Sequence, residues 1–287
     1  MHYPRGGTSS GDRLSERRMV LCADDFAQTT GTIEGILSLL AAGKLSAVSC
    51  LVESPLWPDA ALRVRRLPIA FDAGLHLNLT HEFAGPRSHR PAALPVLLLA
   101  AGLRTISRSR VEASLNRQLD RFEQEMERAP DFVDGHQYVH QLPVVRDALL
   151  SVLRSRYPYS RTAIRVTVPA QSRGLKGLLI AGLGGYGLLD AVRRARIPHN
   201  VDFAGIYDFS PAPAFAERMS QWLSCVRDGG LIVCHPASGG LPNGDPIALA
   251  REREFAYLDS DGFASALRKW RVRLARFRDL PVAQDGA

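Results

Sequence analysis

Lysine is nearly absent from this chain of 287 residues, because only Lys44, Lys176 and Lys269 are lysines among its 36 basic residues. The remaining 33 are arginines, and the formal net charge is +7 at pH 7. Such an excess of basic residues indicates nucleic-acid binding when these residues cluster on one face, often with aromatic rings between them. Here the arginines are scattered, and there is no zinc-finger, RNA-recognition or repeat signature. We therefore expect no nucleic-acid partner.

The chain also lacks paired cysteines and long apolar runs. Its four cysteines show no CxxC spacing, which disfavours a disulfide scaffold or a zinc ribbon. No stretch approaches the ~20 apolar residues of a membrane-spanning helix. The first 18 residues have no apolar core of the kind found in secretory signals. We expect a flexible tail over residues 1–18, no integral membrane segment and a cytoplasmic location, while a homo-oligomer remains open.

What the chain does contain is an alternation of short apolar runs with helical periodicity. We expect strands over 19–23, 45–52, 69–79, 132–139, 163–168, 201–203 and 231–234, and helices over 30–42, 111–128, 144–153, 178–195, 214–226, 247–257 and 263–270. This order predicts an α/β fold with a largely parallel sheet, in one TIM-like barrel domain over residues 19–280. Residues 81–104 are too irregular for one long element, so we expect a binding loop there.

Acids and histidines recur near the expected carboxyl ends of these strands, which is where barrel enzymes place their chemistry. They are Asp24, Asp25, His76, Asn78, Asp134, His136, His140, Arg165 and His235. One histidine on an apolar strand is more often a hydrogen-bonded core residue than a ligand. The recurrence from strand to strand is what indicates a functional site.

Asp25, His76 and His136 would supply one carboxylate and two imidazoles, donors that suit Zn²⁺ and similar cations. Such an ion polarises a carbonyl and lowers the pKa of bound water from ~15.7 toward ~7. Asp24 would then accept the proton of that water as a general base, and His235 would protonate a departing amine. Side chains of neighbouring strand residues point to opposite faces, so Asp24 and Asp25 share a site only if the strand has ended. The alternative is that one of them caps the following helix.

The sequence gives weaker evidence for other kinds of chemistry. Residues 182–187 match the GxGxxG pattern of dinucleotide-binding loops, but their context favours a kinked helix. No GxSxG motif is present, and Cys234 and His235 face opposite ways on a strand. A metal-dependent barrel isomerase or phosphoesterase and a non-catalytic carbohydrate-binding barrel both stay open as alternatives.

Five motifs occur in a fixed order across about residues 19–278: ADDF at 23–26, GLHLNLT at 74–80, DGHQYVH at 134–140, Ile164-Arg165 and His235-Pro236. Together they resemble the YdjC/ChbG-like carbohydrate deacetylases, including the hopanoid-associated branch. The resemblance implies an irregular (β/α) barrel of the glycoside hydrolase/deacetylase type. It also implies metal-dependent hydrolysis of the N-acetyl group of an amino sugar, in an oligosaccharide or a glycolipid.

Carried over to this sequence, the resemblance makes Asp25, His76 and His136 the ligands of one divalent ion, Zn²⁺ or Mg²⁺, with Mn²⁺ or Co²⁺ also compatible. It makes Asp24 the base, by analogy with the paired aspartates of polysaccharide deacetylases, and His235 the late active-site histidine. The residues expected to contact the sugar are Asn78, His140, Arg165 and Phe203.

The sequence departs from the family pattern at three places. Ala27 stands where a glycine is usual, Tyr138 replaces a histidine, and Ala-Ser-Gly-Gly follows Pro236. None of these changes removes an expected ligand. We expect Ala27 to alter the turn behind the aspartates, and the other two changes to affect which sugar is accepted.

Overall fold

The computed structural model describes residues 16–83, 91–159, 161–170, 179–240 and 244–280. Most of the expected tail over residues 1–18 therefore lies outside the described residues, as do Pro86 and His89 of the expected binding loop. Residues 17 and 18 already belong to the first strand, which starts earlier than the apolar run alone indicates.

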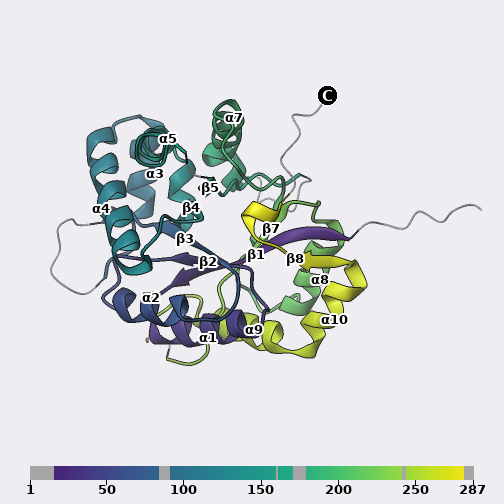
Figure 1. The fold of residues 1–287 in the computed structure, drawn as a ribbon. Helices are drawn as coiled ribbons and strands as arrows, with labels where there is room; N and C mark the ends of the chain where they lie inside the picture. Colours follow the sequence, from purple (N-terminus) through teal and green to yellow (C-terminus); the bar gives the residue numbers. More distant parts are fainter. Residues whose placement is uncertain (1–15, 84–90, 160, 171–178, 241–243, 281–287) are drawn as a thin grey trace, which may run out of the picture.

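A curled sheet of eight parallel strands forms the centre of the molecule (Figure 1). The strands are β1 (Arg17–Phe26), β2 (Ala47–Cys50), β3 (Asp72–Leu77), β4 (Phe132–Gly135), β5 (Ala163–Ile164), β6 (Phe203–Ala204), β7 (Gly230–Cys234) and β8 (Val272–Leu274). Their order is β5-β4-β3-β2-β1-β7-β6, and β8 pairs with β1. The predicted α/β fold of the TIM-like barrel type is confirmed. Between β5 and β6 the described chain makes only an isolated bridge, Ile164 to His199, so the barrel is irregular.

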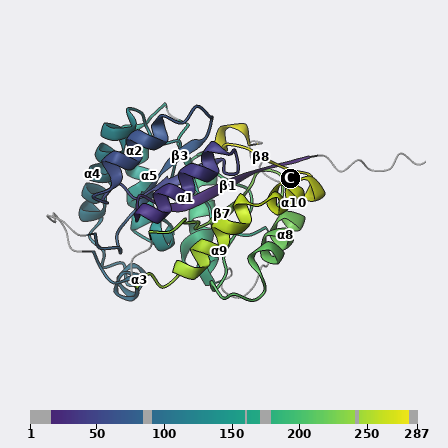
Figure 2. The ribbon, with the colours of Figure 1, turned by 90° about the horizontal axis from the view of Figure 1, so that it is seen from below.

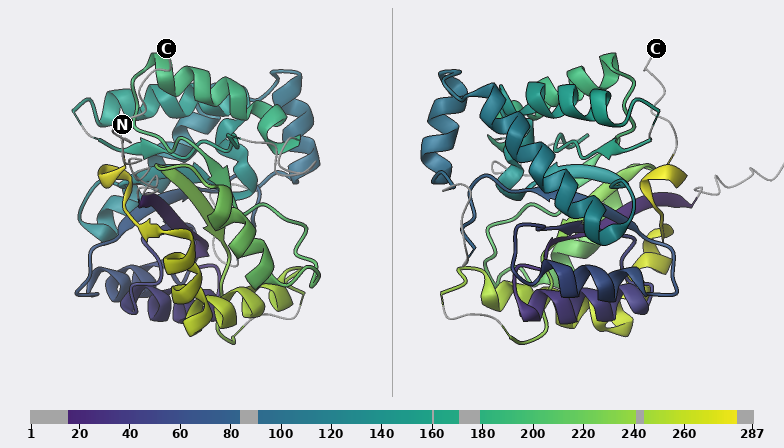
Figure 3. Two further views of the ribbon diagram at one scale, coloured as in Figure 1. Left: turned by 90° about the vertical axis from the view of Figure 1, so that its right-hand side faces the viewer. Right: turned by 60° about the vertical axis from the view of Figure 1, so that its left-hand side comes forward.

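Helices cover the outside of this sheet (Figure 3). They are α1 (Thr30–Ala41), α2 (Trp57–Arg65), α3 (Leu94–Gly102), α4 (Arg108–Met126), α5 (Val145–Arg156), α7 (Tyr186–Arg194), α8 (Phe215–Cys225), α9 (Ala248–Asp259) and α10 (Asp261–Trp270). Helix α1 lies between α2 and α9 on one side of the sheet (Figures 1 and 2). The apolar faces of these helices pack on the strands, whose side chains are almost all buried.

The clearest differences from the sequence expectations lie in two segments. The strand expected over 132–139 ends at Gly135, and residues His136–Gln141 form a 3₁₀ helix, η1. The turn needs a glycine, because a Cβ on Gly135 would lie 2.9 Å from the backbone nitrogen of His140. Within the irregular segment 81–104, Leu94–Gly102 forms a helix with Pro95 in its first turn, where proline is tolerated.

The glycine run at 182–187 lies in a helix, as expected. Ala181–Gly185 forms a short π-helix, η2, which continues directly into α7. Gly184 has a φ of +131°, so the helix is kinked at that residue. Helical backbone on both sides of the kink does not form the open glycine loop that cradles a pyrophosphate.

Candidate metal and catalytic site

The two aspartates of the ADDF motif lie inside β1 rather than after it. The register between β1 and β2 shifts between Ala23 and Phe26, and Asp25 has a φ of +63°. A bulge of this kind lets neighbouring side chains face one side of a strand, and aspartate tolerates the left-handed conformation better than most residues. The expectation that the strand ends before the pair was therefore wrong. The helix-cap alternative is also excluded, because Thr29 caps α1.

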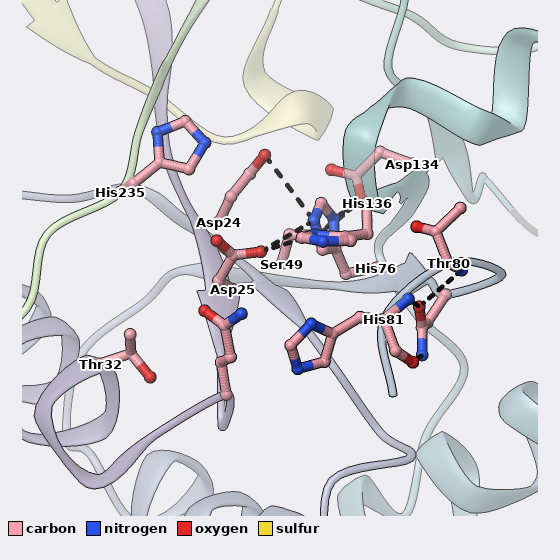
Figure 4. A network of polar contacts seen from close by, with 12 residues as sticks. Asp24, Asp25, Thr32, Ser49, His76, Thr80, His81, Asp134, His136 and His235 are labelled. Atoms are coloured by element: carbon pink, nitrogen blue, oxygen red, sulfur yellow. Dashed lines mark hydrogen bonds and ion pairs between the residues drawn. The ribbon is translucent and has the colours of Figure 1, made fainter. Parts of the chain in front are cut away.

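The three expected metal ligands come together at the carboxyl ends of β1, β3 and β4. One donor atom from each of Asp25, His76 and His136 lies within 4.8 Å of the other two. Asp25 Oδ1 is 3.0 Å from His136 Nδ1 and 3.4 Å from His76 Nε2 (Figure 4). One carboxylate and two imidazoles at this spacing fit a small divalent cation.

A second carboxylate orients His76. Asp134 Oδ1 lies 2.6 Å from His76 Nδ1 and accepts a hydrogen bond of 2.5 Å from the Ser49 hydroxyl. Histidines that bind metals usually donate a hydrogen bond from their other ring nitrogen to such a carboxylate, and this bond fixes the orientation of the ring. Burial lowers the pKa of His76, but Asp134 and Asp24 outweigh it and raise that pKa to about 10. The pocket thus stabilises positive charge at the point where the ligand atoms converge.

Asp24, the expected base, is held from behind by a buried arginine. Arg165 Nη1 donates to Asp24 Oδ2 at 2.7 Å, and Nη2 donates to Oδ1 at 2.5 Å. The same guanidinium forms an ion pair of 2.5 Å with Asp134 and a contact of 3.1 Å with the Cys22 sulfur. Cys22, Asp24 and Asp134 therefore surround an arginine, although their donor atoms also lie close enough together to bind a metal.

The four residues expected to contact the sugar are all buried: Asn78 is 3% exposed, Phe203 1%, and His140 and Arg165 0%. Asn78 Nδ2 donates to the backbone oxygen of His81 at 2.8 Å and to Glu53 at 3.0 Å, closing the loop after β3. His140 Nε2 lies 3.0 Å from the backbone oxygen of Arg165. Each of these side chains is packed among other residues of the described chain, and its contact with a substrate stays a prediction.

His235 follows β7 and lies on the other side of Asp24 from His76 and His136 (Figure 4). Burial lowers its pKa to about 4, although Asp24 and Asp25 pull in the opposite direction. The ring is therefore neutral near pH 7. Its Nδ1 is buried and has no hydrogen-bond partner among the described residues.

Two residues of α9 complete the site and were missed by the sequence reasoning. Arg251 Nη2 donates to Asp25 Oδ2 at 2.8 Å and to Gln28 at 2.7 Å. Burial raises the pKa of Asp25, but Arg251 and His136 outweigh it and hold that pKa well below its usual range. Glu254 accepts a hydrogen bond from the His235 backbone. Both residues fall at helical spacing with the buried Ala250 and Leu258, but their charges hide this buried face in the sequence.

Among the described residues, no helix combines the length and the apolar character needed to cross a bilayer.

Comparisons with known proteins bear on the family and the fold of this chain. A family model described as "YdjC-like protein" matches residues 18–269. A mouse protein named "Carbohydrate deacetylase" is 34% identical over 149 residues, covering 48% of this chain and 47% of that protein. A Yersinia pestis protein named "Chitooligosaccharide deacetylase" is 26% identical over 148 residues, covering 49% of this chain and 57% of that protein. The chain thus matches about half the length of these relatives.

Among solved structures, a protein of Enterococcus faecalis V583, described as a candidate cellobiose-phosphate cleavage protein, is similar in fold. Its TM-score is 0.67 at 21% sequence identity, covering 92% of this chain and 98% of that one. At this identity the similarity supports the fold alone, and it agrees with the curled parallel sheet.

Proposed function

Because the chain belongs to the YdjC-like protein family, as its motifs indicated, we propose that it is a metal-dependent carbohydrate N-deacetylase. The reaction is hydrolysis of the N-acetyl group of an amino sugar. The observation that carries the proposal is the cluster of Asp25, His76 and His136 donor atoms within 4.8 Å, with Asp24 beside it. The names of the mouse and Yersinia relatives favour an acetylated sugar as the substrate.

In this proposal Asp25, His76 and His136 hold one divalent ion, Zn²⁺ or Mg²⁺, with Mn²⁺ or Co²⁺ as further candidates. When bound, such an ion polarises the acetyl carbonyl and acidifies the attacking water. Asp134 keeps His76 Nε2 turned toward Asp25 through its bond to Nδ1. Because Arg251 donates a hydrogen bond to Asp25 Oδ2, Oδ1 is the oxygen that faces the two histidines.

We assign to Asp24 the role of general base, which accepts the proton of the attacking water. Its Oδ2 lies 4.0 Å from His76 Nε2, and the fork of Arg165 fixes both of its oxygens. His235 is assigned the transfer of a proton to the departing amine. Because burial keeps the His235 imidazole neutral near pH 7, it must receive that proton during the reaction before it can donate it.

The single barrel domain over residues 19–280, the cytoplasmic location and a homo-oligomer remain proposals. So do the sugar contacts of Asn78, His140, Arg165 and Phe203. The burial of Arg165 supports a role in holding Asp24 as well.

The test is acetate release from a panel of N-acetylated sugars, free and lipid-linked, by the chelator-treated protein before and after reloading with each metal. Activity that returns only with metal, and that is lost together with metal binding in Asp25→Ala and His136→Ala, would support the proposal. No acetate from any sugar with any of the four metals would overturn it. Phosphate release or sugar isomerisation in its place would favour the alternative barrel enzymes.

A further inference from the structure

Helix α9 buries two ionisable side chains on the face that it turns toward the sheet. Arg251 is 2% exposed and Glu254 0%. Buried charges of this kind are retained only where other polar groups satisfy them. Arg251 reaches Asp25 in β1, whereas Glu254 reaches the segment after β7. One helix therefore contacts the two sides of the proposed reaction centre.

The carboxylate of Glu254 accepts two hydrogen bonds from different parts of the chain. Oε2 accepts from the backbone nitrogen of His235 at 2.5 Å, and Oε1 accepts from the Tyr207 hydroxyl at 2.6 Å. The backbone nitrogen of Ala237 also donates to the backbone oxygen of Arg251 at 3.2 Å. The chain immediately around His235 is thus tied to α9 on both sides of Pro236.

The ring of His235 has little else to define its direction. Within the described residues its Nδ1 makes no hydrogen bond, and the ring makes an edge-to-face contact with Phe209 at a centroid distance of 5.3 Å. Phe209 is in turn held by α9, because Arg253 donates to its backbone oxygen at 3.0 Å. The position of the ring therefore depends on where the His235 backbone is fixed, and Glu254 fixes it.

We propose that Glu254 is a positioning residue for catalysis, which sets the place of the His235 imidazole opposite Asp24 by anchoring the His235 backbone. The inference rests on the proposed function, since it concerns the proton transfer assigned to His235. Among the described residues, Glu254 makes no hydrogen bond or ion pair with Asp25, His76 or His136, so its contribution passes through His235.

The proposal is tested with a double-mutant cycle in the full chain, reloaded with the most active metal. Glu254→Met keeps the volume of the side chain but removes the carboxylate oxygens that accept from the His235 N–H and the Tyr207 hydroxyl. We expect kcat to fall at least about tenfold with KM unchanged, because a misplaced catalytic group slows the chemical step more than binding. Glu254→Gln offers an amide oxygen to the His235 N–H and should keep kcat within about threefold of the unaltered protein.

The decisive readout is the double variant His235→Ala, Glu254→Met. If Glu254 acts through His235, the double variant is no slower than His235→Ala alone, because the group being positioned has already been removed. Tyr207→Phe is the matched control, since it removes the other partner of Glu254 and leaves the His235 bond in place. If Glu254→Met does not fold, Glu254→Asp, which keeps the charge and shortens the side chain, takes its place in the cycle.

The outcomes separate this inference from the proposed function. An unaltered protein without activity, or an active His235→Ala variant, would overturn the function or the role of His235. An active protein whose Glu254→Met variant keeps full kcat would overturn the inference, as would a double variant in which the two losses multiply. Unequal effects of Glu254→Met and Tyr207→Phe on kcat, at similar thermal stability, would support it.

Discussion

Arg165 donates to both carboxylate oxygens of Asp24 at 2.7 and 2.5 Å, and neither residue is more than 3% exposed. A carboxylate held by a two-pronged donor has one orientation, since the planar guanidinium matches both oxygens. The same guanidinium pairs with Asp134, the carboxylate behind His76. The proposed base and the carboxylate that orients a proposed metal ligand are therefore held by one side chain.

Replacing Arg165 with lysine should keep the positive charge but remove the paired hydrogen bonds that the guanidinium donates to Asp24. We expect Arg165→Lys to lower kcat/KM about a hundredfold, because an ammonium cannot align both oxygens of Asp24. Arg165→Met should also lower the free energy of unfolding by about 3–5 kcal/mol, since it leaves buried carboxylates unpaired. Steady-state kinetics and urea unfolding measure the two effects. Arg193→Lys on α7 is the control, and equal behaviour of the two lysine variants would contradict the assigned role.

Asp134→Asn should weaken metal binding and leave the ligand set intact. The amide cannot accept from His76 Nδ1 as strongly as the carboxylate does, so the ring loses its fixed direction. Loss of such a partner typically costs 10–100-fold in metal affinity, and about that loss is expected in calorimetric titration with Zn²⁺. Asp228→Asn, at the ion pair with Arg18, should leave the affinity unchanged. An unchanged affinity in Asp134→Asn would exclude the proposed orientation of His76.

Ala27→Gly should stabilise the protein. Ala27 is fully buried and has a φ of +72°, a conformation that costs a residue with a Cβ roughly 1–2 kcal/mol relative to glycine. After the entropy of glycine in the unfolded chain is subtracted, we expect a gain of about 1 kcal/mol in unfolding free energy. The helical control Ala191→Gly should lose a similar amount. Urea unfolding that shows the same sign for both variants would refute this account of the turn.

His140 should make the fold sensitive to acid. Burial lowers the pKa of its imidazole to about 4, against 6.5 in the unfolded chain. The unfolded state therefore takes up the proton first, and the contribution of His140 to stability is complete above pH 6.5 and is lost as the pH falls toward 4. This loss amounts to about 3 kcal/mol. Unfolding free energies at pH 7, 5.5 and 4 should vary less in His140→Met, and an equal pH slope in both proteins would disprove the prediction.

The sequence was most informative where parallel strands end. His76 lies near the end of β3 and His136 directly follows β4, and the carboxyl ends of parallel strands meet at one edge of the sheet. Their convergence with Asp25 could therefore be predicted. Arg251 and Glu254 could not be assigned in the same way, because charges on the inner face of α9 obscure the apolar stripe by which buried helix faces are recognised.

The bulge in β1 could not be predicted from the sequence either. Period-two alternation describes a regular strand, and the left-handed φ of Asp25 comes from the way β1 pairs with its neighbours. The requirement for glycine at position 135 was equally unpredictable. It arises because the backbone of His140, five residues later, leaves no room for a Cβ. Local patterns located the functional residues, and tertiary contacts decided how their side chains face.

The bond between Asp25 and Arg251 joins residues that are 226 positions apart. A growing chain that leaves the ribosome amino end first exposes Asp25 long before its counter-charge has been synthesised. Strands β7 and β8, which flank β1, arrive equally late. Contacts over such sequence separations form slowly, because a long loop must close before they stabilise the fold. The bond between Arg251 and Asp25 is therefore a late product of folding, and a nascent chain that stops short of α9 lacks this part of the candidate site.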